Sequence, residues 1–267
     1  MSSHISATNL AADASGGVSA KRAIVVGASS GMGAALVVQL VGEGYRVGAI
    51  ARRAEVLEEL QLGCAESAEE AVGEVLVRVH DVTDFGAVPE LFEELVRALG
   101  GLDLFVFAAG IMPKVAADEF DSHKDLAMIE VNFGGLVAWM NPVARLFQSQ
   151  RSGTIVGISS VAGDRGRSGA PVYGATKAAM NTYLESLRNR LGESGVTVCT
   201  IKPGFVDTAM TRGMDGLFWL ISAERAAELI LKAARSGATE RYVPRQWFVL
   251  MTVIRAIPSF LFRKLNI

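Results

Sequence analysis

Hydrophobic and polar positions follow two alternating patterns from Lys21 onward. Short runs that are apolar on both faces predict buried β-strands, and the longer amphipathic stretches between them predict helices. The predicted strands are Ala23–Val26, Arg46–Ala51, Val75–His80, Leu104–Ala108, Thr154–Ile158, Val196–Ile201 and Arg241–Val243. The predicted helices are Ala34–Glu43, Ala54–Leu60, Val88–Leu99, Leu126–Gln148, Val172–Leu191 and Ser222–Ser236.

This alternation predicts the fold class. Strands that are apolar on both faces and joined by helices form a parallel sheet with helices on both sides. Right-handed crossovers then give a Rossmann-like, doubly wound α/β domain of about seven strands, with its ligand crevice at the carboxyl ends of the strands. We find no internal repeat and expect one domain over residues 21–244.

The two ends of the chain differ from this pattern. Residues 1–20 are rich in Ser, Ala and Gly and have no basic start or apolar core, so we expect a disordered leader and not a secretory signal. The tail, residues 245–267, is apolar and basic, but its apolar run is too short to span a bilayer. Three interpretations stay open: packing on its own domain, a subunit interface, or peripheral contact with a membrane surface.

Composition excludes several function classes. Half of the residues are hydrophobic and 20% are charged, which excludes disorder over most of the chain. A net charge of −2 gives no electrostatic reason to expect nucleic-acid binding. Cys64, Cys199 and three histidines show no metal-ligand spacing, so no metal is expected. This cysteine usage fits a reducing cytoplasm.

A glycine-rich turn follows the first predicted strand and leads directly into a helix. Such a turn lets the backbone approach a pyrophosphate, and the helix N-terminus offers free N–H groups to that anion. Its spacing, G-x3-G-x-G, differs from both the common dinucleotide fingerprint and the P-loop. The alternative is a turn without a ligand. The candidate cofactor residues in the turn are Gly27, Ser29, Ser30, Gly31, Met32 and Gly33.

The second predicted strand ends in two arginines, Arg52 and Arg53. Folds that prefer NAD commonly have an acidic residue there, which binds the ribose 2′-hydroxyl. An acid would repel a 2′-phosphate, whereas arginine can chelate one. The sequence therefore favours NADP(H), with solvated loop charges as the alternative.

The third and fourth strands end in further cofactor candidates. A carboxylate at Asp81 could accept from the adenine amino group while Val82 packs on the ring; the alternative for Asp81 is a cap for the following turn. Ala109 and Gly110 are small enough to let the chain pass close to a nucleotide.

Candidate catalytic groups lie in the second half of the chain. Tyr173 and Lys177 are four residues apart in a predicted helix, so both side chains lie on one face. A neighbouring cation lowers the pKa of a phenol, which is ordinarily about 10, toward the working pH. The alternative is two unrelated surface residues. Ser159 and Ser160 follow a strand at the crevice edge, and Asn132 interrupts an apolar helix, where a buried amide must hydrogen-bond.

In their order and spacing, these motifs resemble the short-chain dehydrogenase/reductase family from about Lys21 to Val243. The resemblance implies an NADP(H)-dependent oxidoreductase and, commonly, a homodimer or homotetramer. The residues that carry it are Gly27, Gly31, Gly33, Asp81, Asn132, Ser160, Tyr173, Lys177, Pro203, Gly204 and Thr208.

The resemblance also implies a role for each matching residue. Tyr173 would be the general acid in reduction and the base in oxidation. Lys177 would lower the pKa of Tyr173 and hold the nicotinamide ribose. Ser160 would hydrogen-bond the substrate oxygen, and is chosen over Ser159 because the family places its serine thirteen residues before the tyrosine. Asn132 would position a water. The cofactor contacts after the sixth strand would be Pro203, Gly204, Val206 and Thr208, with Thr208 orienting the amide and phosphate end.

Two departures and one variable segment qualify the resemblance. The family often has threonine where this chain has Val26, and asparagine in the segment where it has Phe107-Ala108, so cofactor binding could be weaker or altered in specificity. Thr211–Leu220 contains Met214 and Trp219, which favours either an apolar lid over the crevice or ordinary packing.

We therefore expect a cytoplasmic NADPH-dependent carbonyl reductase or alcohol dehydrogenase, with an apolar ketone, aldehyde or secondary alcohol as substrate. One alternative is a non-catalytic NADP(H)-binding regulator on the same fold. The other is an epimerase or dehydratase of the same family.

Overall fold

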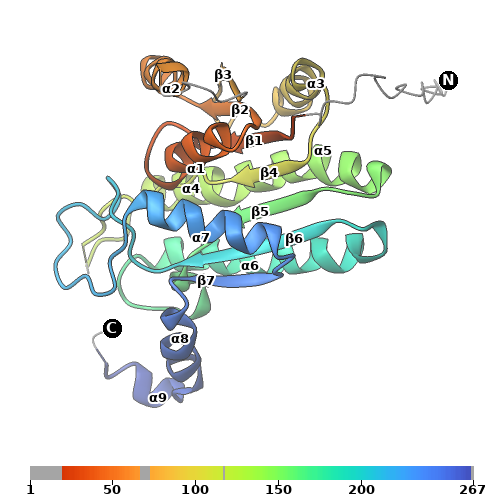
Figure 1. Cartoon of the computed structure of the whole chain (residues 1–267). Helices are drawn as coiled ribbons and strands as arrows, with labels where there is room; N and C mark the ends of the chain where they lie inside the picture. The colour runs from red at the N-terminus through yellow and green to blue at the C-terminus, as the bar shows by residue number, and fades with distance from the viewer. Residues whose placement is uncertain (1–19, 67–72, 117, 266–267) are drawn as a thin grey trace.

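The computed structural model describes residues 20–66, 73–116 and 118–265, so almost all of the predicted leader lies outside the described residues. One parallel sheet of seven strands has the order β3-β2-β1-β4-β5-β6-β7 (Figure 1). This confirms the predicted doubly wound α/β fold, with the order of strands reversing between β1 and β4. The strands are β1 (Arg22–Val26), β2 (Arg46–Ala51), β3 (Glu74–Val79), β4 (Leu104–Phe107), β5 (Thr154–Ile158), β6 (Thr197–Pro203) and β7 (Glu240–Val243).

Helices cover both faces of the sheet because alternate strand residues point to opposite sides. In β1, Ala23 and Val25 pack toward one layer of helices, whereas Ile24 and Val26 pack toward the other. The first layer contains α1 (Gly31–Gly42), α2 (Ala54–Glu66) and α7 (Ala223–Arg235). The second contains α3 (Val88–Leu99), α5 (Gly135–Gln150) and α6 (Pro171–Leu191).

The predicted helix Leu126–Gln148 is longer and less regular in the structure. It consists of α4 (Ser122–Met128), a π-helical segment (Ile129–Gly134) and α5. Asp121 begins α4, because its side chain accepts hydrogen bonds from the first-turn N–H groups of His123 and Lys124. The π-helical segment contains Asn132, the residue that interrupts the apolar pattern, and such insertions are frequent at functional sites.

The C-terminal tail forms two helices, α8 (Gln246–Ala256) and α9 (Ser259–Phe262), which project beyond β7 (Figure 1). Trp247, Met251, Ile254 and Phe262 are buried in a third apolar cluster, so the tail packs on its own domain. The contact is close at Gly204, where a Cβ would lie 1.9 Å from Nε1 of Trp247. Within the described residues, no helix has the length and apolarity needed to cross a membrane.

Candidate active site

Two adjoining cavities lie at the carboxyl ends of the strands. The first has a volume of about 260 Å³ and the second about 310 Å³, and both are bordered by Met32, Thr208 and Met210. The predicted cofactor residues that line the first cavity are Gly27, Ser29, Ser30, Gly31, Met32, Gly33, Arg52, Arg53, Val82, Ala109, Gly110 and Thr208.

The glycine turn forms one wall of the first cavity and is held by backbone hydrogen bonds. Gly27 has φ +92°, and a Cβ there would lie 2.5 Å from the backbone nitrogen of Ala109, so only glycine fits. Its N–H donates to the Ile50 carbonyl (2.8 Å), and the N–H of Ala108 donates to the Val26 carbonyl (2.8 Å). The turn is therefore fixed without the threonine and asparagine that the family often has.

The N-terminus of α1 opens on this turn and suits an anion. Ser30 precedes the helix in an extended conformation, but its side chain makes no capping hydrogen bond. The first turn of α1 also contains no acidic residue. Its free N–H groups and positive dipole end therefore remain available to a phosphate, so the residues present fit a dinucleotide pyrophosphate.

The arginines at the end of β2 border the same cavity. The Arg53 guanidinium donates to Oγ (2.9 Å) and to the carbonyl (3.0 Å) of Ser29. Arg52 Nη1 lies 3.4 Å from Oδ2 of Asp81, and both side chains are substantially exposed. Since an exposed ion pair of this kind is weak, Arg52 remains able to bind another anion.

Asp81 is placed differently from its neighbours and does not line either cavity. Its Oδ1 accepts from the N–H (3.0 Å) and Oγ1 (2.8 Å) of Thr83, the turn-capping arrangement given above as the alternative. Burial, the largest single influence, raises the pKa of Asp81, but the Thr83 hydrogen bonds and the Arg52 charge together lower it below its usual range. An adenine contact by Asp81 stays a prediction.

Ser160 and Tyr173 meet in the second cavity. Tyr173 comes from the first turn of α6, which begins at Pro171, and Ser160 follows β5. Burial raises the pKa of Tyr173, while the nearby Ser160 hydroxyl and the positive charge of Arg167 act in the opposite direction. The phenol is thus held protonated near neutrality. Ser159, by contrast, is buried and donates to the Lys177 carbonyl (3.1 Å).

Lys177 is buried on the same helix as Tyr173. Its Nζ lies 5.7 Å from the centroid of the Tyr173 ring and donates to the Ile158 carbonyl (2.9 Å). Burial lowers the pKa of Lys177 itself to about 8. The expected effect of Lys177 on the pKa of Tyr173 stays a prediction.

Asn132 is fully buried beside Lys177. Its Oδ1 accepts from the N–H of Ile111 (2.7 Å), while Nδ2 donates to the Ile111 carbonyl (3.0 Å) and to Oγ1 of Thr176 (3.2 Å). A Cβ at Gly110 would lie 3.3 Å from Oδ1 of Asn132 and 3.6 Å from Nζ of Lys177. Both polar groups therefore lie just behind the wall of the first cavity. The water-positioning role of Asn132 stays a prediction.

The segment after β6 borders the second cavity. Pro203, Gly204 and Val206 line the second cavity and not the glycine-turn cavity; Thr208 lines both. For Thr211–Leu220, the sequence favours either an apolar lid over the crevice or ordinary packing, and each applies to part of the segment. Its first part borders the cavity at Met214, whereas Phe218 packs on Trp247 of the tail, with ring centroids 5.0 Å apart.

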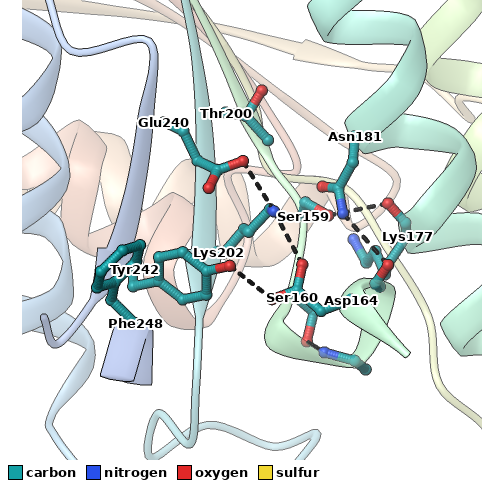
Figure 2. A network of polar contacts seen from close by, with 12 residues as sticks. Ser159, Ser160, Asp164, Lys177, Asn181, Thr200, Lys202, Glu240, Tyr242 and Phe248 are labelled. Atoms are coloured by element: carbon teal, nitrogen blue, oxygen red, sulfur yellow. Dashed lines mark hydrogen bonds and ion pairs between the residues drawn. The ribbon is translucent and has the colours of Figure 1, made fainter. Parts of the chain in front are cut away.

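A buried charge network lies behind Ser160. Figure 2 shows Lys202, from β6, between Asp164 and Glu240, with Nζ–O distances of 2.8 Å to both. The Tyr242 hydroxyl donates to the other oxygen of Asp164 (2.6 Å). Asp164 ends the short 3-10 helix that Ser160 begins, so the network attaches the Ser160 loop to β6 and β7.

Sequence reasoning did not single out several residues of the second cavity. The most informative are Arg165 and Arg167, in the loop between Ser160 and Tyr173. Arg165 donates to the carbonyls of Ile254 (3.1 Å) and Ile257 (2.6 Å) at the end of α8. A signal was available, because the two arginines lie in the short segment between the candidate residues Ser160 and Tyr173.

Fold and site together define a dinucleotide-binding α/β protein with a serine–tyrosine pair, and comparison with known proteins gives its family. The family model described as short chain dehydrogenase matches residues 21–215. The chain therefore belongs to the short-chain dehydrogenase/reductase family of oxidoreductases, whose members use NAD(P).

Relatives and solved structures agree with this assignment. An uncharacterized oxidoreductase of Myxococcus xanthus is 34% identical over 247 residues, which are 92% of this chain and 96% of the relative. An uncharacterized oxidoreductase of Staphylococcus saprophyticus is 34% identical over 73% of this chain and 82% of its own length. The structure of ElxO with NADP bound is 25% identical, with a TM-score of 0.72 over 80% of this chain and 91% of ElxO. Levodione reductase shares the fold at 22% identity, with a TM-score of 0.74 over 84% of this chain and 95% of its own.

Proposed function

We propose that this protein is an NADP(H)-dependent oxidoreductase that interconverts an apolar ketone or aldehyde and the corresponding alcohol. The observation that carries the proposal is that Ser160 and Tyr173 line the same cavity, which adjoins the glycine-turn cavity. Apolar side chains of Met112, Val161 and Phe205 border the second cavity and favour an apolar substrate body.

The arginines at the end of β2 support the choice of NADP(H). Arg52 and Arg53 border the first cavity, and no Asp or Glu is among the described residues that line it. Guanidinium groups bind phosphate through paired, charge-assisted hydrogen bonds, so this edge suits a 2′-phosphate. ElxO, whose solved structure holds NADP, is similar in fold.

The chain's own groups then supply proton transfer and charge stabilisation. When bound, NADPH supplies the hydride that forms the new C–H bond at the carbonyl carbon. As the C=O π electrons move to oxygen, Tyr173 transfers its proton to that oxygen and Ser160 donates a hydrogen bond to it. In the direction of alcohol oxidation the phenolate accepts the proton. Lys177, next to the wall of the first cavity at Gly110, contacts the nicotinamide ribose in this proposal.

The test is NADPH oxidation with a panel of apolar ketones and aldehydes. Ser160→Ala should lower kcat/KM about 10²–10³-fold, because it removes one donor to the developing oxyanion. Ser149→Ala is the matched control, since Ser149 is an exposed serine of α5 outside both cavities. If no carbonyl oxidises NADPH while NADPH still binds, the proposal fails, and the result favours a cofactor-binding regulator or an epimerase or dehydratase of the same family.

A further inference from the structure

One arginine of the second cavity has no partner of its own. Arg167 lies in the loop between Ser160 and α6 and is only partly exposed. It makes no hydrogen bond or ion pair with any of the described residues, unlike Arg165, whose guanidinium is bound by carbonyls of the tail and stacks 4.3 Å from the Phe262 ring centroid. A partly buried guanidinium without a counter-ion is unfavourable, and burial accordingly lowers the pKa of Arg167.

No acidic side chain among the described residues of the second cavity neutralises the charge of Arg167. The described residues that line the second cavity include two arginines and no Asp or Glu. The nearest carboxylate along the loop, Asp164, is already bound by Lys202 (2.8 Å) and by the Tyr242 hydroxyl (2.6 Å). The N-terminus of α6, whose first turn has no acidic residue, adds the positive end of a helix dipole at Ala170.

The same cavity also has apolar walls. Met32, Met112, Met210 and Met214 line it together with Val161 and Phe205. Methionine side chains adapt to ligands of different shape, so these walls would take an apolar body of variable form. The cavity therefore combines one cation that is unpaired among the described residues with an adaptable apolar surface, and Ser160 and Tyr173 line it as well.

We propose that the substrate carries a carboxylate in addition to its carbonyl group, and that Arg167 binds this carboxylate. The inference rests on the proposed reductase function and narrows its substrate class to apolar oxo acids or the corresponding hydroxy acids. A guanidinium can bind a carboxylate through two parallel hydrogen bonds. Such a contact would fix the distance and direction of the substrate carbonyl relative to Ser160 and Tyr173. Holding the reacting groups in this geometry lowers the entropic part of the reaction barrier.

Matched acids and esters test the proposal. Benzoylpropionate, benzoylbutyrate and their methyl esters present the same aryl ketone at two spacings, with methylene groups that insulate the carbonyl from the acid. Wild-type kcat/KM for NADPH oxidation should favour the acid over its ester by about tenfold or more at one spacing, the size of a charge-assisted hydrogen bond. Arg167→Gln should lower kcat/KM about 10–100-fold more for that acid than for its ester, because a change in the pKa of Tyr173 affects both substrates alike, while Arg167→Lys should keep part of the preference.

Two controls separate the ways in which the idea could fail. Arg190→Gln removes the same charge from an exposed position of α6 outside both cavities and should leave the preference intact. An equal loss for acid and ester in Arg167→Gln would mean that Arg167 acts only through the pKa of Tyr173, which overturns the proposal. Turnover of esters at least as fast as acids would also overturn it while leaving the reductase function intact.

Binding provides a readout that does not depend on turnover. Calorimetric titration of each acid and ester into the NADP⁺-treated protein measures affinity directly. If the acids bind, the esters do not, and Arg167→Gln abolishes the difference, the carboxylate site stands even if no probe is reduced, and it is the proposed reductase function that fails. Equal binding of acid and ester, with or without Arg167, would contradict the carboxylate site.

Discussion

The two ends of the crevice hold their polar groups in different ways. At the cofactor end, the glycine turn, the helix N-terminus and the two arginines come from the consecutive elements β1, α1 and β2, and the charges of Arg52 and its neighbour Asp81 are exposed. Behind the substrate end, Lys202 is buried, and its partners Asp164 and Glu240 come from segments far apart in the chain. The cofactor end therefore depends on the local backbone conformation of the glycine turn, with exposed charges at its edge. The substrate end depends on buried charges that pair inside the protein.

This difference predicts how each end responds to change. Exposed charges at a rim affect the binding of a charged ligand but contribute little to folding, because water screens them in both states. Buried charges are stable only with their partners, so a change there alters folding, pKa values and chemistry together. The following predictions separate the two cases, beginning with the largest effect.

Tyr173→Phe should abolish most turnover and leave the cofactor end intact. Removal of the general acid should lower kcat about 10²–10⁴-fold, while NADPH affinity changes less than about twofold. Steady-state NADPH oxidation and a fluorescence titration of NADPH measure the two quantities. Tyr183→Phe, a half-buried tyrosine of the same helix, should retain activity. Wild-type turnover by Tyr173→Phe would remove the proposed proton donor.

Lys202→Met should destabilise the substrate end. It leaves the buried carboxylate of Asp164 without its cation, which costs about 3–5 kcal/mol in the free energy of unfolding. Urea denaturation measures this loss. Arg225→Met breaks an exposed pair with Glu228 and should change stability by less than about 1 kcal/mol. Similar losses in the two variants would show that the buried network is no more important than a surface pair.

The buried Lys177 should make stability depend on pH. Its pKa is lowered from 10.5 to about 8, so between these values the unfolded chain binds a proton that the folded protein does not. In the cofactor-free protein, the free energy of unfolding should therefore rise with pH across this window, by about 3 kcal/mol in total. Below about pH 8 this contribution is lost, because the buried group must then carry its charge.

The measurement is the difference in unfolding free energy between wild type and Lys177→Met from about pH 8 to about pH 10.5. Other titrating groups largely cancel in that difference. A difference that stays flat with pH, or falls, would show that Lys177 keeps its ordinary pKa in the folded protein.

Arg52→Ala should have the smallest effect and one confined to the cofactor end. Loss of a charge-assisted contact to the 2′-phosphate should weaken NADPH binding about 10–100-fold, leave NADH binding unchanged and alter stability by less than about 0.5 kcal/mol. Arg78→Ala is the control, because Arg78 pairs with Glu94 away from both cavities. An unchanged ratio of NADPH to NADH affinity would contradict the NADP(H) assignment.

The boundaries of the elements show where local pattern is insufficient. The sequence predicts that the second helix ends at Leu60, but α2 continues through Gly63 to Glu66. Glycine is a weak helix former, so the local pattern ends early. Tertiary contacts extend the helix: Nε2 of Gln61 donates to the Val75 carbonyl (2.6 Å), and Cys64 is buried in the core.

The C-terminal tail shows even more clearly that a local sequence pattern does not determine which residues are buried. Its apolar run has no clear polar face, so the sequence left three interpretations open and did not predict α8 or α9. In the structure one face is buried on Val161 and Tyr242, while Phe248, Val249 and Val253 remain exposed. Which apolar residues are covered depends on the surface of the domain, which the tail sequence does not contain.

The sequence by itself determined the alternation of strands and helices, the glycine turn and the arginines after β2. Steric limits on φ and the twofold strand period act within a few residues, so a local pattern is enough to specify them. The tertiary structure decided that Lys177 is directed at a backbone carbonyl, that the tail is bound by Arg165, and that Arg167 has no partner among the described residues. Burial and pairing depend on segments about 80–90 residues apart, such as Asp164 with Tyr242 and Arg165 with Ile254, and only the folded chain brings them together.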